Sequence, residues 1–192
     1  SCMSLKPVQI KKSMTDYKNI LELYRSSFPE AARFPIWLLR IMSHLKGAHS
    51  VAFCDGDRLC GFSYFLVNEE TVFIFYLAVN NIGRSKGYGS QIISWIRETY
   101  PDRDIFLDVE EPDECAENNS QRLKRIEFYR RNGIFETEHS FNYGGVVYRI
   151  LCTDRNFTEE DYYENLTSYF KLFKKKRRGL YNEKNGKQDH RH

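Results

Sequence analysis

The spacing of hydrophobic positions divides the chain into segments with a helical period and segments with a strand period. Five segments repeat apolar residues every three or four positions, which predicts amphipathic helices at residues 15–28, 35–45, 91–100, 119–132 and 158–173. Seven shorter segments alternate apolar and polar residues or are apolar throughout, which predicts strands at residues 8–12, 50–54, 59–67, 71–79, 104–109, 134–143 and 146–152.

The order of these expected elements is β-α-α-β-β-β-α-β-α-β-β-α. Hairpin-linked strands that lead into one strand-helix-strand unit predict a mixed, mostly antiparallel sheet with helices on both faces. We therefore expect a single α/β (α+β) domain over residues 1–173, with its last helix at 158–173.

Composition agrees with one globular domain. The chain has 192 residues, of which 41% are hydrophobic, with 14 Phe and 13 Tyr among them. This is enough apolar side chain for one core, and the chain is too short for two full-sized domains. No stretch approaches the roughly 18 apolar residues of a membrane-spanning helix, and the first residues lack the pattern of a secretion signal. We therefore expect a cytoplasmic protein with no membrane partner.

Cysteine usage argues against two kinds of site. The five cysteines are odd in number and are never spaced as C-x-x-C. That pattern indicates neither a disulfide framework nor a zinc site, so we expect free thiols and no metal.

The net charge of +3 is concentrated at one end of the chain. Residues 174–192 contain eight Lys or Arg against Glu183 and Asp189, a local charge of +6, so that residues 1–173 sum to −3. Nothing in this segment can build a core, and we expect a flexible basic tail. The remainder has no general attraction for nucleic acid, although a nucleic-acid-associated role for the tail stays an alternative.

A glycine-rich loop joins a predicted buried strand directly to a predicted helix. Its sequence runs from Val79 through Arg84, Gly87 and Gly89 into the helix. The first amides of a helix have no internal partner and lie at its positive end, so a backbone that approaches closely through glycine can bind a phosphate. The loop has neither the G-x-x-x-x-G-K-[ST] pattern of a P-loop nor the third glycine of a dinucleotide fingerprint.

The loop resembles the coenzyme A loop of the GNAT superfamily of N-acetyltransferases, V-x-x-x-x-[RQ]-x-x-G-x-[GA]. A second segment, F-Y-R-R-N-G-I at residues 128–134, is similar to the family's [LF]-Y-x-x-x-G-[FI]. The expected element order from residue 8 to 152 also follows the family, and the longer form is similar to a bacterial subgroup whose substrate is unassigned.

The resemblance implies an acetyl-CoA-dependent N-acetyltransferase that acts on a primary amine of a small molecule or peptide, by direct attack through a tetrahedral intermediate. The pyrophosphate-binding residues it implies are Arg84, Ser85, Lys86, Gly87, Tyr88, Gly89 and Ser90. The implied partners of the pantetheine arm are Leu77, Ala78 and Val79, and Asn119 is expected to replace a usual asparagine contact. We expect a monomer or a homodimer.

The resemblance implies an acid and a base, and the acid has a matching residue in the motif whereas the base does not. Tyr129 takes the place of the acid that protonates the departing thiolate, with a role as a core tyrosine as the alternative. The predicted strand at 71–79 contains no carboxylate, so we expect the base on the next strand, at Glu110, with Asp108 or Glu111 acting through water as alternatives. The alternative for Glu110 is that it is a solvated residue at the end of the strand, without a catalytic role. A non-catalytic acyl-CoA-binding module is the competing function.

The helix at 119–132 departs from the family at two places. Arg122 and Arg125 stand where many members have Asn and Ala. Four aromatic residues, Tyr24, Phe28, Phe34 and Trp37, are candidates for an acceptor pocket or for ordinary core packing.

Overall fold

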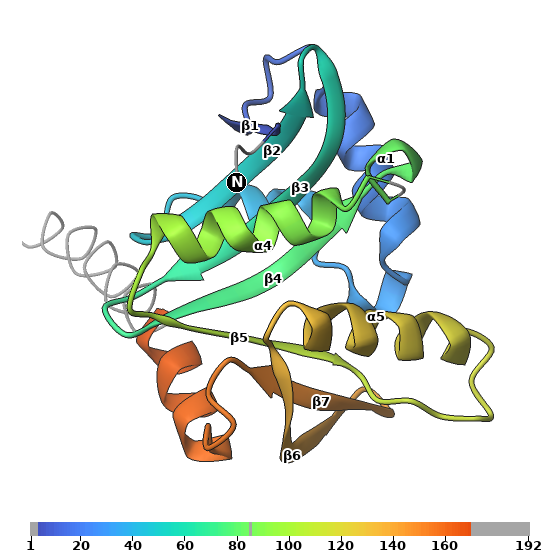
Figure 1. Ribbon diagram of the computed structural model, residues 1–192, viewed down its shortest axis with the longest axis vertical. Helices are drawn as coiled ribbons and strands as arrows, with labels where there is room; N and C mark the ends of the chain where they lie inside the picture. The colour runs from blue at the N-terminus through green and yellow to red at the C-terminus, as the bar shows by residue number, and fades with distance from the viewer. Residues whose placement is uncertain (1–3, 85, 170–192) are drawn as a thin grey trace, which may run out of the picture.

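The computed structural model describes residues 4–84 and 86–169 (Figure 1). Its strands are β1 (Lys6–Gln9), β2 (Ala48–Asp55), β3 (Arg58–Val67), β4 (Thr71–Val79), β5 (Asp104–Glu110), β6 (Phe135–Tyr143) and β7 (Val146–Cys152). Its helices are α1 (Tyr17–Ser27), α2 (Ile36–Met42), α3 (Asn81–Arg84), α4 (Tyr88–Thr99) and α5 (Asn119–Arg131), with a 3₁₀ turn at Glu30–Ala32. Residues 159–169 are helical as well.

The strands form one seven-stranded sheet in the order β1-β2-β3-β4-β5-β7-β6. Every neighbouring pair is antiparallel except β4 and β5. The predicted mixed, mostly antiparallel fold is therefore confirmed. Ser85, the end of the last expected helix at 170–173 and the expected basic tail at 174–192 lie outside the described residues.

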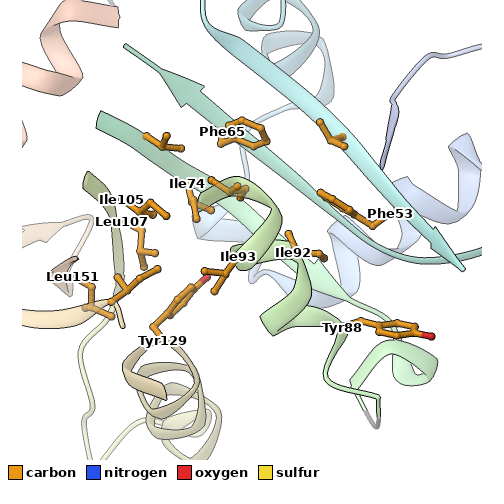
Figure 2. Close-up of a cluster of buried hydrophobic side chains, with 14 of the residues drawn as sticks. Phe53, Phe65, Ile74, Tyr88, Ile92, Ile93, Ile105, Leu107, Tyr129 and Leu151 are labelled. Carbon is orange, nitrogen blue, oxygen red and sulfur yellow. The ribbon is translucent and has the colours of Figure 1, made fainter. Parts of the chain in front are cut away.

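The alternation of side chains along the strands separates two layers of core. On β5, Ile105 and Leu107 face α4 and α5, where they pack with Ile93 and Tyr129 (Figure 2). Phe106 faces the opposite side and packs with the helix at 159–169. The helices α1 and α2 cover that same side over β2, β3 and β4. Because both faces of the central strands are covered, β4 reads as an unbroken apolar run.

The two central strands separate after a short parallel contact. Thr71–Phe73 of β4 pairs with Asp104–Phe106 of β5, and the register ends there. In the pairing of β3 with β4, Phe65 lies opposite Ile74 but Tyr64 lies opposite Tyr76, so Phe75 is an extra residue in a β-bulge. A bulge bends its strand and increases its twist. Beyond it, β4 turns away from β5, and the sheet opens between the two strands (Figure 1).

Most differences from the predicted elements are shifts of boundaries. The helix expected from residue 91 begins at Tyr88, because Gly87 takes the left-handed conformation, with φ +69°, directly before it. The one-turn helix α3 inside the glycine-rich loop was not predicted, since four residues carry no visible period. Over the described ranges 4–84 and 86–169, no helix combines the length and the apolar character needed to cross a bilayer.

Candidate active site

A cavity of about 1100 Å³ opens where β4 and β5 separate, bounded by β4, the start of α4, α5 and the end of α1. Eight of the predicted site residues line it: Leu77, Ala78, Val79, Arg84, Gly87, Gly89, Ser90 and Tyr129. The site is thus built from the carboxyl end of one strand and from two helices that pack side by side on the same face of the sheet.

The start of α4 provides backbone donors at the cavity wall. Gly87 is the N-cap, and the first hydrogen bond within the helix runs from the Gln91 amide to the Gly87 carbonyl over 3.2 Å. The amides of residues 88–90 therefore belong to the first turn, which has no intrahelical partner and carries the positive end of the helix dipole. The guanidinium of Arg84 lies at the same cavity. This arrangement is suited to a phosphate group.

Gly87 and Gly89 are needed for different reasons. A Cβ at Gly87 would meet no heavy atom within 4 Å, so glycine is needed there because the backbone takes a positive φ. A Cβ at Gly89 would lie 2.9 Å from Cζ of Phe128 on α5. Gly89 therefore allows α4 to approach α5 closely, in addition to any approach to a ligand.

Three predicted contacts point away from the cavity. The Tyr88 side chain lies at the edge of the core (Figure 2), and its hydroxyl donates to Asp55 Oδ2 over 2.6 Å. Lys86 Nζ lies 4.0 Å from the same Asp55 oxygen. The Asn119 side chain accepts from the Asp113 amide over 2.8 Å, which closes the loop before α5. Lys86 and Tyr88 can still contribute backbone amides, whereas nothing places the Asn119 side chain at the cavity.

Tyr129 presents its hydroxyl to the cavity while its ring belongs to the core. Only 5% of the residue is exposed, and the ring packs against Ile93 and Leu107 (Figure 2). Burial raises the pKa of Tyr129, a nearby negative charge at Asp108 raises it further, and the positive charge of Arg125 lowers it. Tyr129 is thus held in its protonated form at neutral pH.

Two of the three candidate carboxylates are bound to arginines. Glu110 is 9% exposed, and its Oε2 lies 2.7 Å from Nη2 of Arg122 and accepts from Asn118 over 3.3 Å. Glu111 pairs with Arg149 of β7. Neither glutamate lines the cavity.

Asp108 has a different environment. It is half-buried on β5 and accepts a hydrogen bond of 2.7 Å from the Tyr162 hydroxyl, which comes from the helix at 159–169. Burial raises the pKa of Asp108. Its negative charge raises the pKa of Tyr76, Tyr129 and Tyr148 as well. The carboxyl group therefore contacts Tyr162 and acts through its charge on tyrosines of β4, α5 and β7, although Asp108, like the two glutamates, does not line the cavity.

The aromatic residues proposed for an acceptor pocket fall into two groups. Tyr24, Phe28 and Phe34 surround Tyr76 of β4, with the Phe28 and Tyr76 ring centres 4.8 Å apart. The Tyr24 hydroxyl donates to the Phe34 carbonyl over 2.8 Å, which fixes the segment between α1 and α2 onto the sheet. Trp37, in contrast, is 63% exposed and does not belong to this group.

The cavity wall carries more positive than negative charge. Five cationic residues line it, Arg84, Lys124, Arg125, Arg130 and Arg131, against two acidic ones, Glu127 and Glu136. Both acidic side chains bind Arg130. The sequence singled out Arg125 only as a departure from the family, and it gave no signal for Lys124, Arg130 and Arg131. In the two described ranges, no three His, Cys, Asp or Glu residues gather in a way that suits a metal ion.

Comparisons with known proteins bear on the family. The model of the acetyltransferase (GNAT) family matches residues 17–134, more than half of the chain. No curated protein matches. Among solved structures, the chain is similar to a GNAT-family acetyltransferase from Bacteroides thetaiotaomicron, with 25% identity, a TM-score of 0.67, and coverage of 86% of this chain and 95% of that one.

Two further structures are more distant. An aminoglycoside 6′-N-acetyltransferase from Enterococcus faecium is 14% identical, with a TM-score of 0.56 and coverage of 77% of this chain and 95% of that one. An acetyltransferase from Bacillus subtilis in complex with CoA is 15% identical, with a TM-score of 0.54 and coverage of 78% and 98%. These two show a shared fold. With the family match over the strand, loop and helices that bound the cavity, the chain belongs to the acetyltransferase (GNAT) family.

Proposed function

We propose that the protein transfers the acetyl group of acetyl-CoA to a primary amine of a small molecule or peptide. The observation that carries this proposal is the meeting, at one cavity, of the first amides of α4, the end of β4 and the hydroxyl of Tyr129. A phosphate site, a strand edge and a proton donor are the three parts that this reaction needs. The Enterococcus faecium neighbour is named for an aminoglycoside substrate, which is consistent with an amine acceptor.

The chain's own groups suit an acyl-CoA molecule along its length. The amides at the start of α4 and the cationic side chain of Arg84 attract the pyrophosphate. Because β4 has no partner strand on its β5 side after Phe73, the backbone of Leu77–Val79 is available to the amide groups of the pantetheine arm. A backbone amide here also stabilises negative charge on the thioester oxygen.

Tyr129 acts as the proton donor to the departing thiolate. Its raised pKa keeps it protonated at neutral pH, so the hydroxyl can give its proton to the CoA thiolate as the carbon–sulfur bond of the tetrahedral intermediate breaks. Within the described parts of the chain, no hydrogen bond occupies the Tyr129 hydroxyl. The group is therefore free to act on a ligand in the cavity.

We assign the base to Asp108 rather than to Glu110. The two side chains share one face of β5, but the Glu110 carboxylate is paired with the Arg122 guanidinium, whereas the Asp108 carboxylate accepts from the neutral Tyr162 hydroxyl. The raised pKa of Asp108 makes it a better proton acceptor near neutral pH than an ordinary aspartate, and its charge is felt at Tyr129. Asp108 takes the proton of the incoming amine directly or through one water molecule.

The test compares Asp108→Asn with Glu110→Gln in thiol-release assays on acetyl-CoA and a panel of primary amines. Loss of the base should lower kcat/KM of Asp108→Asn by roughly 10²- to 10⁴-fold at neutral pH, with recovery as the pH approaches the pKa of the amine. Glu110→Gln should keep most of its activity. If kcat/KM falls by this amount in Glu110→Gln and is unchanged in Asp108→Asn, the base is Glu110 and not Asp108.

The same assays separate the competing function. A non-catalytic module would bind acetyl-CoA in calorimetry but release no thiol with any amine. Release that increases with a specific amine, and that falls in Asp108→Asn, identifies an enzyme.

A further inference from the structure

Arg125 is a cation at the cavity wall that has no anionic partner. It lies on α5, one turn before Tyr129, and is half-buried. Its Nη2 donates a long hydrogen bond of 3.4 Å to the Ser27 carbonyl at the end of α1. Its guanidinium carbon lies 5.5 Å from the centre of the Phe28 ring. Across the described ranges, no carboxylate lies within 4.0 Å of its nitrogens.

Arg122, on the same helix, has the polar partners that Arg125 lacks. Arg122 donates to Asn118 Oδ1 over 2.8 Å and to the Glu111 carbonyl over 2.9 Å, and it pairs with Glu110 over 2.7 Å. The acidic residues of the cavity wall cannot serve Arg125, because both bind Arg130. A partly desolvated charge without a counter-ion is costly, so a ligand that brings an anion gains from it.

The position of Arg125 connects it to the reacting groups. Its positive charge lowers the pKa of Tyr129, which the negative charge of Asp108 raises, so both charges act on the same hydroxyl. Phe28, which packs under Arg125, also contacts the ring of Tyr76, whose pKa Asp108 raises. Arg125 therefore lies at the cavity wall beside the proposed acid, and its charge and the charge of Asp108 act in opposite directions on that acid.

We propose that the acceptor carries a carboxylate in addition to its primary amine, and that Arg125 binds this carboxylate while Asp108 receives the proton of the amine. This inference rests on the proposed function and narrows its acceptor to amino acids. The planar guanidinium forms paired hydrogen bonds with a carboxylate, and the weak contact to the Ser27 carbonyl is easily exchanged for them. The opposite charges of Arg125 and Asp108 match the two charges of a free amino acid.

The test measures binding and turnover of paired acceptors by the full chain. Calorimetry with CoA-saturated protein uses α-, β- and γ-amino acids, each beside its own carboxamide. The wild-type protein should prefer a carboxylate over the matching amide. Arg125→Gln should lower that preference by roughly 10- to 100-fold, the range for a lost charged hydrogen bond, and should leave the affinity for CoA unchanged.

Two further variants serve as matched controls. Lys124→Gln removes the adjacent cation of the same cavity wall and should leave the preference unchanged. Arg125→Lys keeps the positive charge but lacks the paired guanidinium donors, so it should retain part of the preference for the carboxylate. Because Arg125 also influences Tyr129, turnover is compared as the ratio of kcat/KM for the two members of a pair, in which a defect of the acid cancels.

Several results would overturn the inference. Wild-type protein that does not distinguish any carboxylate from its amide, or Arg125→Gln that keeps the preference, would remove its basis. Loss of CoA affinity in Arg125→Gln would make Arg125 a phosphate contact. A preference of the wild type for succinyl-CoA over acetyl-CoA that depends on Arg125 would place the carboxylate on the acyl group. Absence of acetyl transfer to every amine, with the binding preference intact, would contradict the proposed function alone.

Discussion

The ring and the hydroxyl of Tyr129 lie in different surroundings. Its ring is packed in the core between α5 and the sheet, and its hydroxyl reaches the cavity. The spacing of Leu123, Ile126 and Tyr129 predicts a packing stripe, but Leu123 is 51% exposed and lines the cavity, so only the second half of the helix is anchored in this way. A packing role and an acid role for Tyr129 are therefore compatible.

The variant Tyr129→Phe removes the hydroxyl and keeps the ring. We expect little change in the free energy of unfolding, because the core contacts remain. The turnover number should fall by roughly 10²-fold, with nearly unchanged affinity for acetyl-CoA, because only a proton donor is lost. Stopped-flow or steady-state thiol release and calorimetry measure the two quantities. Normal turnover with a true acceptor would leave Tyr129 as a packing residue.

The choice among the carboxylates shows where the sequence stops being informative. Alternation along β5 correctly places Asp108 and Glu110 on one face, opposite Leu107. Their ranking depends on partners that are distant in sequence or on another element. Arg122 binds Glu110, and Tyr162, 54 residues after Asp108, donates to Asp108. No local pattern encodes such contacts.

At the scale of elements, strands with a clear period are predicted best. The bounds of β4 and β7 agree with the predicted segments 71–79 and 146–152. The start of α4 and the whole of α3 were missed, because a helix that begins inside a glycine-rich loop has no apolar stripe to show it. The four residues of the loop motif nevertheless all line the cavity, at the end where we propose that phosphate binds.

Gly87 allows a controlled test of that end. We expect Gly87→Ala to lower acetyl-CoA affinity, because the left-handed N-cap that aims the α4 amides becomes strained. Gly144 in the turn between β6 and β7 is a matched control, with φ +60° and also no heavy atom within 4 Å of an added Cβ. Both alanine variants should lose about 1 kcal/mol of stability. Only Gly87→Ala should bind acetyl-CoA more weakly in calorimetry; equal affinities would argue against a ligand at this loop.

The helix at 159–169 lies beyond the residues that the family model matches, yet it reaches the proposed site through Tyr162. In Tyr162→Phe, the hydrogen bond that lowers the pKa of Asp108 is lost while the burial that raises it remains. The base is active when deprotonated, so the acidic limb of the pH–rate profile should move to higher pH. A uniform loss of rate at every pH would mean that the helix acts only through packing.

At the scale of the whole molecule, the separation of β4 from β5 forms the cavity of the proposed site, and the features that suit this site for a reaction also lower the stability of the fold. The proposed site combines an unpaired edge of β4 with a carboxyl group, that of Asp108, on the neighbouring strand β5. Both features oppose stability, because backbone groups and charges are best left in water or fully paired. The order of elements predicts the mixed sheet, whereas the opening between β4 and β5 and the surroundings of Asp108 depend on the strand register and on contacts between distant residues.

The burial of Asp108 gives a prediction for the stability of the whole protein. Burial raises the pKa of Asp108 in the folded state, so its contribution to stability is complete below the unfolded pKa and is lost as the pH rises through the folded pKa. Asp108→Asn does not titrate and can still accept from Tyr162. Its free energy of unfolding, relative to wild type, should therefore be higher at pH 8 than at pH 4.5 in urea denaturation. Glu110→Gln should be less stable than wild type at pH 8, since it leaves Arg122 without its counter-ion. A relative stability of Asp108→Asn that falls between pH 4.5 and pH 8 would show that the folded protein stabilises the Asp108 carboxylate, which would contradict a raised pKa of Asp108 and its assignment as the base.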